Sequence, residues 1–83
     1  MSIENRRRKD LTYYLSLPYT IQLTPDKNGV WFASIPILKG CMTQGDNREH
    51  ALIMLDEAKE LWLETALEEN IFIPEPLVEA LSS

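Results

Sequence analysis

The sequence predicts a small α+β domain in which a sheet of three or four strands carries one long helix on one face. Two observations lead to this fold class. Two short strand-like segments flank a turn, and a later segment, residues 47–69, contains neither Gly nor Pro. A short apolar run follows the helix, so the predicted order is β-β-β-α-β. With 83 residues the chain has room for one hydrophobic core.

A β-hairpin is predicted from the first two strands. Residues 19–24 alternate apolar and polar side chains, and residues 30–35 are rich in β-branched and aromatic residues. Between them, Asn28 and Gly29 both tolerate the positive φ of a tight turn. Pro36 ends or bends the second strand, because proline has no N–H for a ladder hydrogen bond.

The third strand is predicted to be short. Residues 37–40 form a turn, residues 41–44 form the strand, and Gly45 releases the chain toward the helix. None of the three predicted strands contains Asp or Glu. We therefore do not expect the converging carboxylates that a two-metal nuclease needs.

The long helix is predicted over residues 47–69. Asp46 or Asn47 caps its start, and with Asp46 as the cap Glu49 completes a capping box. Small and apolar side chains recur every three or four residues on one face, which is typical of a helix packed on a sheet. This apolar stripe is Ala51, Leu55, Ala58, Trp62 and Ala66, with Leu52 and Leu63 on one flank and Met54 and Leu61 on the other. The opposite, acidic face carries Glu57, Glu60, Glu64 and Glu68.

The last predicted strand is the apolar run at residues 71–73. A crossover through the helix would place it in the same sheet, with a right-handed connection. The Pro-Glu-Pro sequence at residues 74–76 ends it. The chain therefore divides into a basic, flexible arm at residues 1–16, a folded domain at residues 17–76 and a short tail at residues 77–83.

Charge is unevenly distributed along the chain. The net charge is −5 and the pI is about 4.7. Residues 1–10 carry four bases against two acids, whereas residues 11–83 carry four bases against eleven acids. The acidic body would repel a nucleic-acid backbone and attract a basic protein. One alternative function is a nucleic-acid-binding module that uses an open sheet face and the basic arm residues Arg6, Arg7, Arg8 and Lys9.

Composition argues against several further classes of protein, namely membrane, secreted, disulfide-rich and zinc-finger proteins. No apolar run approaches the length of a membrane span, and no apolar segment follows the basic start as it would in a signal peptide. One Cys and one His exclude a disulfide framework or a zinc finger within one chain. We expect a cytoplasmic protein without metal, cofactor or membrane contact.

Candidate catalytic side chains are few. Cys41 and His50 are the only candidates for a thiol nucleophile and its base, and a buried strand thiol and a surface histidine are the favoured interpretation. A vestigial nuclease would depend on Asp46. Trp31 and Phe32 fit base stacking on a sheet face, but core or interface packing is favoured because no bases are interleaved with them.

Several segments, taken in order, carry a family resemblance. They are Leu17-Pro18-Tyr19-Thr20-Ile21, Gly29-Val30-Trp31-Phe32-Ala33-Ser34-Ile35-Pro36, Lys39-Gly40-Cys41-Met42-Thr43-Gln44-Gly45-Asp46, Ala51-Leu52 through Glu57-Ala58, Ala66 to Asn70, and Ile73-Pro74-Glu75-Pro76. Together they resemble the HicB family of antitoxins from type II toxin–antitoxin systems, over residues 17–76. The motif positions are Pro18, Tyr19, Gly29, Pro36, Gly40, Gln44, Gly45, Asp46, Ala51, Ala58, Pro74 and Pro76.

The resemblance implies a partial RNase H-like fold that has lost its nuclease carboxylates, and therefore a protein that is not an enzyme. It implies a partner, the small basic mRNA-cleaving toxin HicA, whose access to RNA the antitoxin blocks. On the acidic body, the expected toxin contacts are Glu57, Glu60, Glu64 and Trp31. Only residues 77–83 follow Pro76, so we do not expect the DNA-binding domain that many relatives carry. An uncovered sheet face and unpaired edges predict a homo-oligomer.

Overall fold

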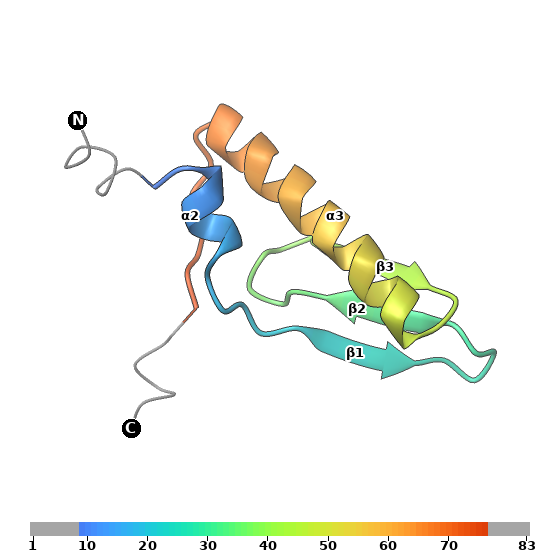
Figure 1. The fold of residues 1–83 in the computed structure, drawn as a ribbon. Helices are drawn as coiled ribbons and strands as arrows, with labels where there is room; N and C mark the ends of the chain where they lie inside the picture. The colour runs from blue at the N-terminus through green and yellow to red at the C-terminus, as the bar shows by residue number, and fades with distance from the viewer. Residues whose placement is uncertain (1–8, 77–83) are drawn as a thin grey trace, which may run out of the picture.

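A three-stranded antiparallel sheet lies under one long helix, with a short helix beside it (Figure 1). The structure is a computed structural model and describes residues 9–76. Its elements are α2 (Leu11–Leu15), β1 (Gln22–Pro25), β2 (Trp31–Ser34), β3 (Met42–Gly45) and α3 (Arg48–Glu68). The predicted α+β class, with a sheet carrying one long helix, is confirmed.

The predicted hairpin is formed by β1 and β2, which pair antiparallel with Leu23 opposite Ala33. Gly29 has a φ of +91°, and its N–H donates a 3.0 Å hydrogen bond to the carbonyl of Asp26, which closes the turn. Both strands are shorter than predicted. Tyr19 precedes β1 and contributes to the core instead of the ladder.

The turn between β2 and β3 contains a core residue. The N–H of Leu38 donates to the carbonyl of Ile35 at 2.9 Å, and the carbonyl of Leu38 accepts from Cys41 at 2.8 Å. This double turn, closed by Gly40 at a φ of +86°, directs the Leu38 side chain inward, where it is fully buried. Periodicity predicted only a turn at residues 37–40, because a single apolar residue in a turn has no repeat to reveal it.

Helix α3 begins at an Asn47 cap. The Asn47 side-chain oxygen accepts a 2.8 Å hydrogen bond from the N–H of His50. The imidazole Nδ1 of His50 in turn accepts a 3.0 Å hydrogen bond from the N–H of Asp46. Of the two predicted caps, Asn47 is therefore the one used, and the capping box from Asp46 to Glu49 is not formed.

The buried face of α3 is rotated slightly from the predicted stripe. Leu63, predicted on the flank, is fully buried, whereas Ala58 and Trp62 from the stripe are only half-buried. Leu61, on the other predicted flank, is 65% exposed. The buried residues of the core are Tyr14, Tyr19, Ala33, Ile35, Leu38, Cys41, Ala51, Leu55, Leu63, Ala66 and Ile73.

Residues 11–16 do not behave as part of an arm. Helix α2 starts at Asp10, whose carboxylate accepts a 3.0 Å hydrogen bond from the N–H of Tyr13, and it packs on α3 through the buried Tyr14. The prediction of an arm over residues 1–16 is therefore corrected for residues 11–16, which belong to the folded body. Residues 1–8 and the predicted tail at residues 77–83 lie outside the described residues.

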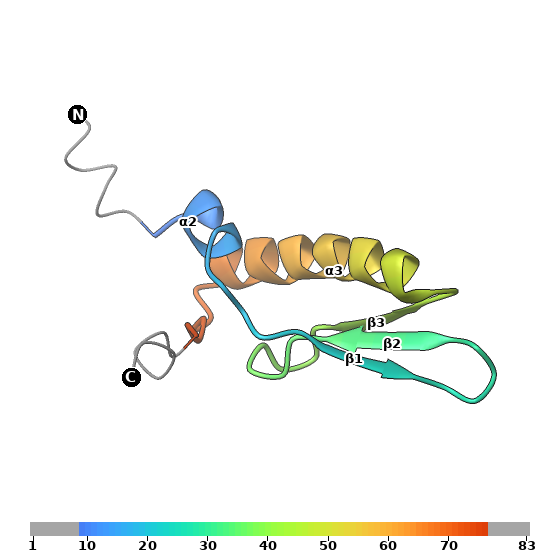
Figure 2. The same cartoon turned by 60° about the horizontal axis from the view of Figure 1, so that its bottom comes forward.

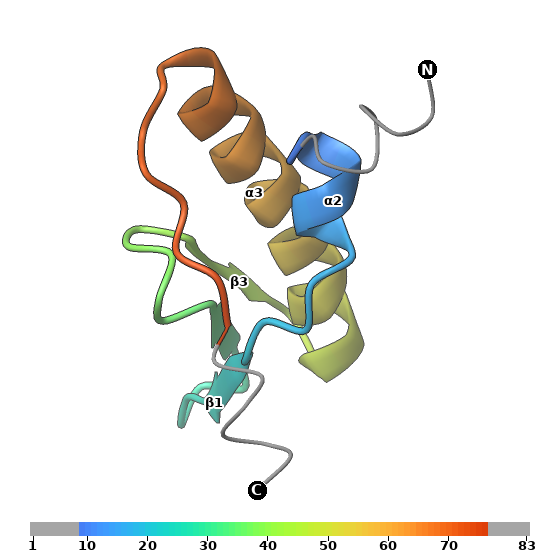
Figure 3. The same cartoon turned by 90° about the vertical axis from the view of Figure 1, so that its left-hand side faces the viewer.

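The predicted fourth strand is not formed within residues 9–76. After Asn70, at a φ of +58°, the chain turns back from the end of α3 and runs extended toward the start of β1 (Figure 3). Residues 71–76 have no ladder partner, and the carbonyl of Pro74 instead accepts a 2.7 Å hydrogen bond from the Tyr19 hydroxyl. Tyr19, which precedes β1, and Ile73 are both buried members of the hydrophobic core. The RNase H-like relationship stays a prediction.

One face of the sheet is covered by α3 and the other is not covered by any described residue (Figure 2). Cross-strand partners point to the same face, so the register gives the uncovered set. It consists of Gln22, Thr24, Phe32, Ser34, Met42 and Gln44. Met42 is 67% exposed and Phe32 44% exposed, so this face presents two large apolar side chains and no charge.

Candidate protein-interaction site

The acidic face of α3 brings three predicted contact residues together. Glu57, Glu60 and Glu64 are all exposed and follow one another at three- and four-residue steps. Glu68 continues the row at the end of the helix, and the last turn contains no base. Because the C-terminus of a helix carries a partial negative charge, these carboxylates add to an already negative end. This arrangement does not stabilise the helix, but it would attract a positively charged partner.

Trp31 lies away from that face. It is on the helix-facing side of β2, level with Gly45 of β3. The Arg48 guanidinium, in the first turn of α3, lies 5.9 Å from the Trp31 ring centroid. Arg48 and Glu57 are nine positions apart along the helix, a rise of roughly 13 Å. Trp31 and the acidic face therefore do not form one continuous contact surface.

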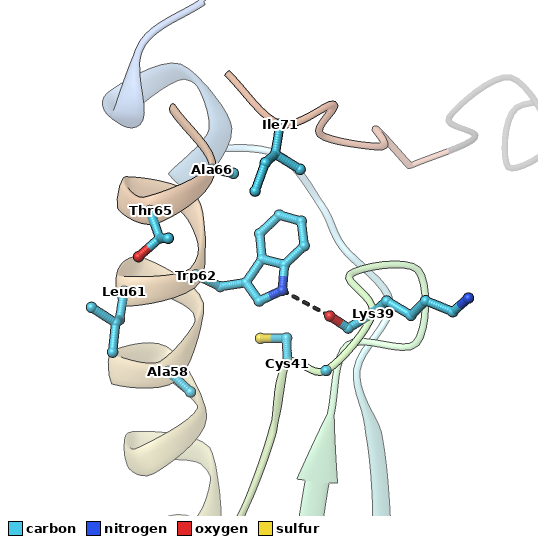
Figure 4. Close-up of a pocket in the computed structure, with 9 residues that line it drawn as sticks. Lys39, Cys41, Ala58, Leu61, Trp62, Thr65, Ala66 and Ile71 are labelled. Atoms are coloured by element: carbon cyan, nitrogen blue, oxygen red, sulfur yellow. Dashed lines mark hydrogen bonds between the residues drawn. The ribbon is translucent and has the colours of Figure 1, made fainter. Parts of the chain in front are cut away.

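An apolar groove, which sequence patterns did not reveal, opens beside the acidic face (Figure 4). It has a volume of about 590 Å³ and lies between the second half of α3 and the turn before β3. Its main lining residues are Cys41, Leu61, Trp62, Thr65, Ala66 and Ile71. Leu61 is 65% exposed and Ile71 52% exposed, which is unusual for two large apolar side chains at one groove. The sequence feature that could have indicated the groove is Leu61, a large apolar residue on the flank of the predicted stripe.

The groove has a fixed wall. The indole N–H of Trp62 donates a 2.9 Å hydrogen bond to the carbonyl of Lys39 and so ties α3 to the turn (Figure 4). Cys41 lies below the indole, and burial raises the pKa of its thiol. A thiol with a raised pKa is a poorer nucleophile at neutral pH. His50 lies beyond the opposite end of β3, so the two candidates for a thiol and its base are not brought together.

A second polar cluster joins the two ends of the described chain. The Glu75 carboxylate accepts hydrogen bonds from Lys9 Nζ at 3.1 Å and from the Tyr13 hydroxyl at 3.0 Å. The hydrogen bond from Lys9, and after it the one from Tyr13, lowers the pKa of Glu75. The same bond to Glu75 raises the pKa of Lys9. Lys9 is therefore already paired. The other predicted nucleic-acid contacts, Arg6, Arg7 and Arg8, lie outside the described residues.

Metal and membrane sites find no support in residues 9–76. No group of three or more His, Cys, Asp or Glu side chains in that range is placed to hold a metal ion. Neither of the two described helices combines the length and apolar character needed to cross a membrane.

Comparison with known proteins supplies the family. The sequence profile described as HicB-like antitoxin of bacterial toxin-antitoxin system matches residues 19–82, more than half of the chain. The chain belongs to the HicB-like antitoxin family. Membership implies a place in a toxin–antitoxin system and a toxin as partner, as the sequence resemblance predicted.

Individual relatives agree with this HicB-like assignment. A UPF0150 protein of Thermoplasma acidophilum is 33% identical over 66 residues, which cover 80% of this chain and 96% of that protein. A UPF0150 protein of Synechocystis is 43% identical over 56 residues, covering 68% and 77%. Antitoxin HicB 1 of Photorhabdus laumondii is 38% identical over 61 residues, which cover 74% of this chain but only 39% of that antitoxin. No solved structure matches the chain.

Several of the HicB motif positions have structural explanations. Gly29 and Gly40 adopt positive φ, and Gly45 allows close approach of β3 to α3. Tyr19 and Ala51 are buried, and the carbonyl of Pro74 is bonded to Tyr19. These motif residues build the fold, whereas the acidic face, the groove and the uncovered sheet face are exposed.

Proposed function

We propose that this HicB-like chain is a non-enzymatic antitoxin that binds a small basic HicA-type ribonuclease and blocks its access to RNA. The observation that carries the proposal is the acidic face of α3 in a member of an antitoxin family. Glu57, Glu60 and Glu64 project from one face with no base among them, which is an electrostatic complement to a positively charged, RNA-binding protein.

Electrostatics set the expected behaviour of this contact. Opposite potentials speed encounter and fix orientation, and salt weakens them over a Debye length of about 10 Å at 0.1 M. Rapid association matters for an antitoxin, because free toxin cleaves RNA until it is captured. Capture should therefore be fast at low salt and slower at high salt.

The test begins with affinity purification of the tagged chain from its own cells at low salt. The expected companion is a basic protein of under about a hundred residues, identified by mass and then purified for an RNA-cleavage assay. The chain should suppress cleavage at equimolar concentration. If the purified companion cleaves RNA equally well with and without the chain, the antitoxin proposal is wrong.

We also propose that the chain self-associates through its uncovered sheet face. This face is the uncharged part of an acidic molecule, so two copies meet there with the least repulsion. The outer edges of β1 and β3 are also free of strand partners within residues 9–76. Sedimentation should show a dimer or larger species that Met42→Lys shifts toward the monomer. A wild-type monomer at high concentration would contradict this.

The nucleic-acid alternative has less support. The uncovered face holds Phe32 for stacking but none of its six side chains is basic, so phosphate contacts would have to come from the arm. In the described part of that arm, Lys9 is paired with Glu75. RNA binding by the wild-type chain that disappears on deletion of residues 1–10 would favour this alternative.

A further inference from the structure

The apolar groove and the acidic face are two parts of one surface. Leu61, on the rim of the groove, is four residues after Glu57 and three before Glu64, so the three side chains are neighbours on α3. Glu68 lies seven residues, about two turns, after Leu61 on the same side of the helix. Three carboxylates therefore lie beside the rim residue Leu61, and Lys39 is the single base among the residues that line the groove.

We propose that this groove is the anchor site for the partner, and that it receives a large apolar side chain carried on a Lys- or Arg-rich segment of a basic protein. The proposal rests on the proposed function for the identity of that protein. It assigns the two steps of binding to different residues. The acidic face captures the partner, and Leu61, Trp62 and Ile71 retain it.

The groove is prepared before binding. The hydrogen bond from Trp62 to the Lys39 carbonyl holds one wall, and the fully buried Leu38 holds the turn from the other side. A site whose walls are already in place loses little conformational freedom when it is filled. Its volume of about 590 Å³ has room for a bulky apolar side chain. Aromatic residues such as Trp62 in central pockets are frequent binding hot spots.

Charge favours a basic partner over two alternative occupants of the groove, which are a second copy of this chain and the chain's own residues 77–83. A second copy of this chain carries a net charge of −5 and would bring its own acidic face to the same rim. Residues 77–83 of the chain itself contain Glu79 and no Lys or Arg. A basic segment gains from the three rim carboxylates and from the negative C-terminal end of α3.

The experiment compares two equally exposed apolar residues of α3. Leu61, 65% exposed, lines the groove, whereas Ile53, 58% exposed, does not. Leu61→Gln and Ile53→Gln leave charge unchanged and should leave the thermal midpoint unchanged. Two probes are used, the purified HicA-type toxin and a synthetic amphipathic Leu/Lys peptide, with a Gln/Lys peptide of equal charge as control. Binding kinetics are measured at two salt concentrations.

For both probes we expect Leu61→Gln to raise the dissociation rate roughly tenfold with little change in association rate or salt dependence. Ile53→Gln should match wild type, and the Gln/Lys peptide should bind weakly to all three chains. Equal effects of Leu61→Gln and Ile53→Gln, or none from either, would overturn the anchor site.

The remaining outcomes separate the anchor site from the antitoxin proposal. Toxin that binds wild type and Leu61→Gln equally removes the groove but keeps the antitoxin function. Toxin that binds no variant, while the Leu/Lys peptide binds in a Leu61-dependent way, removes the antitoxin function but keeps the groove.

A changed sedimentation coefficient for Leu61→Gln would show a second copy in the groove. A change in Trp62 environment, read by fluorescence in a Trp31→Phe background, on deletion of residues 77–83 would show the chain's own tail there. Either result overturns the proposal.

Discussion

The hydroxyl of Tyr13 donates a 3.0 Å hydrogen bond to Oε1 of Glu75, 62 positions further along the chain. The other oxygen of Glu75 accepts from Lys9 at 3.1 Å, so one carboxylate joins the start of the described chain to its end. Since residues 71–76 have no strand partner within residues 9–76, this cluster and the Tyr19–Pro74 bond hold them in place.

Glu75→Gln tests the cluster through pH. Because the pKa of Glu75 is lowered, its ionised form favours the folded state above the ordinary carboxyl value of 4.5. That contribution is lost as pH falls from 4.5 through the lower, folded value. The difference in thermal midpoint between wild type and Glu75→Gln should therefore be present at pH 7 and vanish in strong acid. Glu69→Gln, at an exposed carboxylate, is the control, and a difference independent of pH would contradict the prediction.

Tyr19 should ionise late. Burial, followed by the nearby Glu75 charge, raises its pKa to about 12. A raised pKa means that the neutral phenol favours folding, so this contribution is complete below pH 10 and is lost as pH rises through about 12. Phenolate absorbance should show a late step that is missing in Tyr19→Phe. At pH 7 the same variant should lose about 1 kcal/mol, because the Pro74 carbonyl loses its donor.

Gly45→Ala should destabilise the junction of β3 and α3. A Cβ at this position would lie 2.7 Å from Ala51 Cα and 2.8 Å from the His50 carbonyl carbon, both backbone atoms that cannot turn aside. We expect a loss of about 1–3 kcal/mol in urea unfolding. Gly29→Asn is the comparison: a Cβ there would meet nothing within 4 Å, so its cost is limited to the strain of a positive φ, which Asn tolerates better than most residues, and should be the smaller of the two. Equal stability of Gly45→Ala and wild type would show that the two elements lie further apart.

Leu63 and Leu61 test the rotation of α3. Leu63 is fully buried, so Leu63→Ala should cost about 2–5 kcal/mol of unfolding free energy. Leu61 is 65% exposed, and Leu61→Ala should change stability by less than about 0.5 kcal/mol. Chemical denaturation of the two variants measures both. Similar costs for the two variants would place the buried face of the helix where the sequence pattern predicts it, midway between the flanks that carry Leu61 and Leu63.

Charge reversal on α3 should act on association. Glu57→Lys, Glu60→Lys and Glu64→Lys combined should slow toxin binding roughly tenfold or more at low salt and flatten its salt dependence, with a smaller effect on dissociation. Reversal of Asp46, Glu49 and Glu69, which are also exposed but outside the acidic face, makes the same change in net charge and is the control. Equal slowing in both variants would show that net charge, rather than this face, attracts the toxin.

Patterns among neighbouring residues are sufficient to predict several features of this protein. The hairpin around Gly29, the long helix, its acidic face and the family resemblance are all patterns within short stretches of chain. Local rules also limited the helix cap to two residues, of which Asn47 is used. These features need only neighbouring residues, so a linear sequence contains them.

The rotation of α3, the missing fourth strand and the groove depend on contacts between distant parts of the chain. The apolar stripe of α3 was wide enough to pack at more than one angle. The sheet and α2 both pack on the helix, and in this arrangement Leu63 is buried and Leu61 is exposed. Residues 71–73 have strand propensity but no ladder in the described chain, because pairing depends on a neighbour and not on the segment itself. The groove arises from the same cause: its walls come from residues more than twenty positions apart, joined by the hydrogen bond from Trp62 to Lys39.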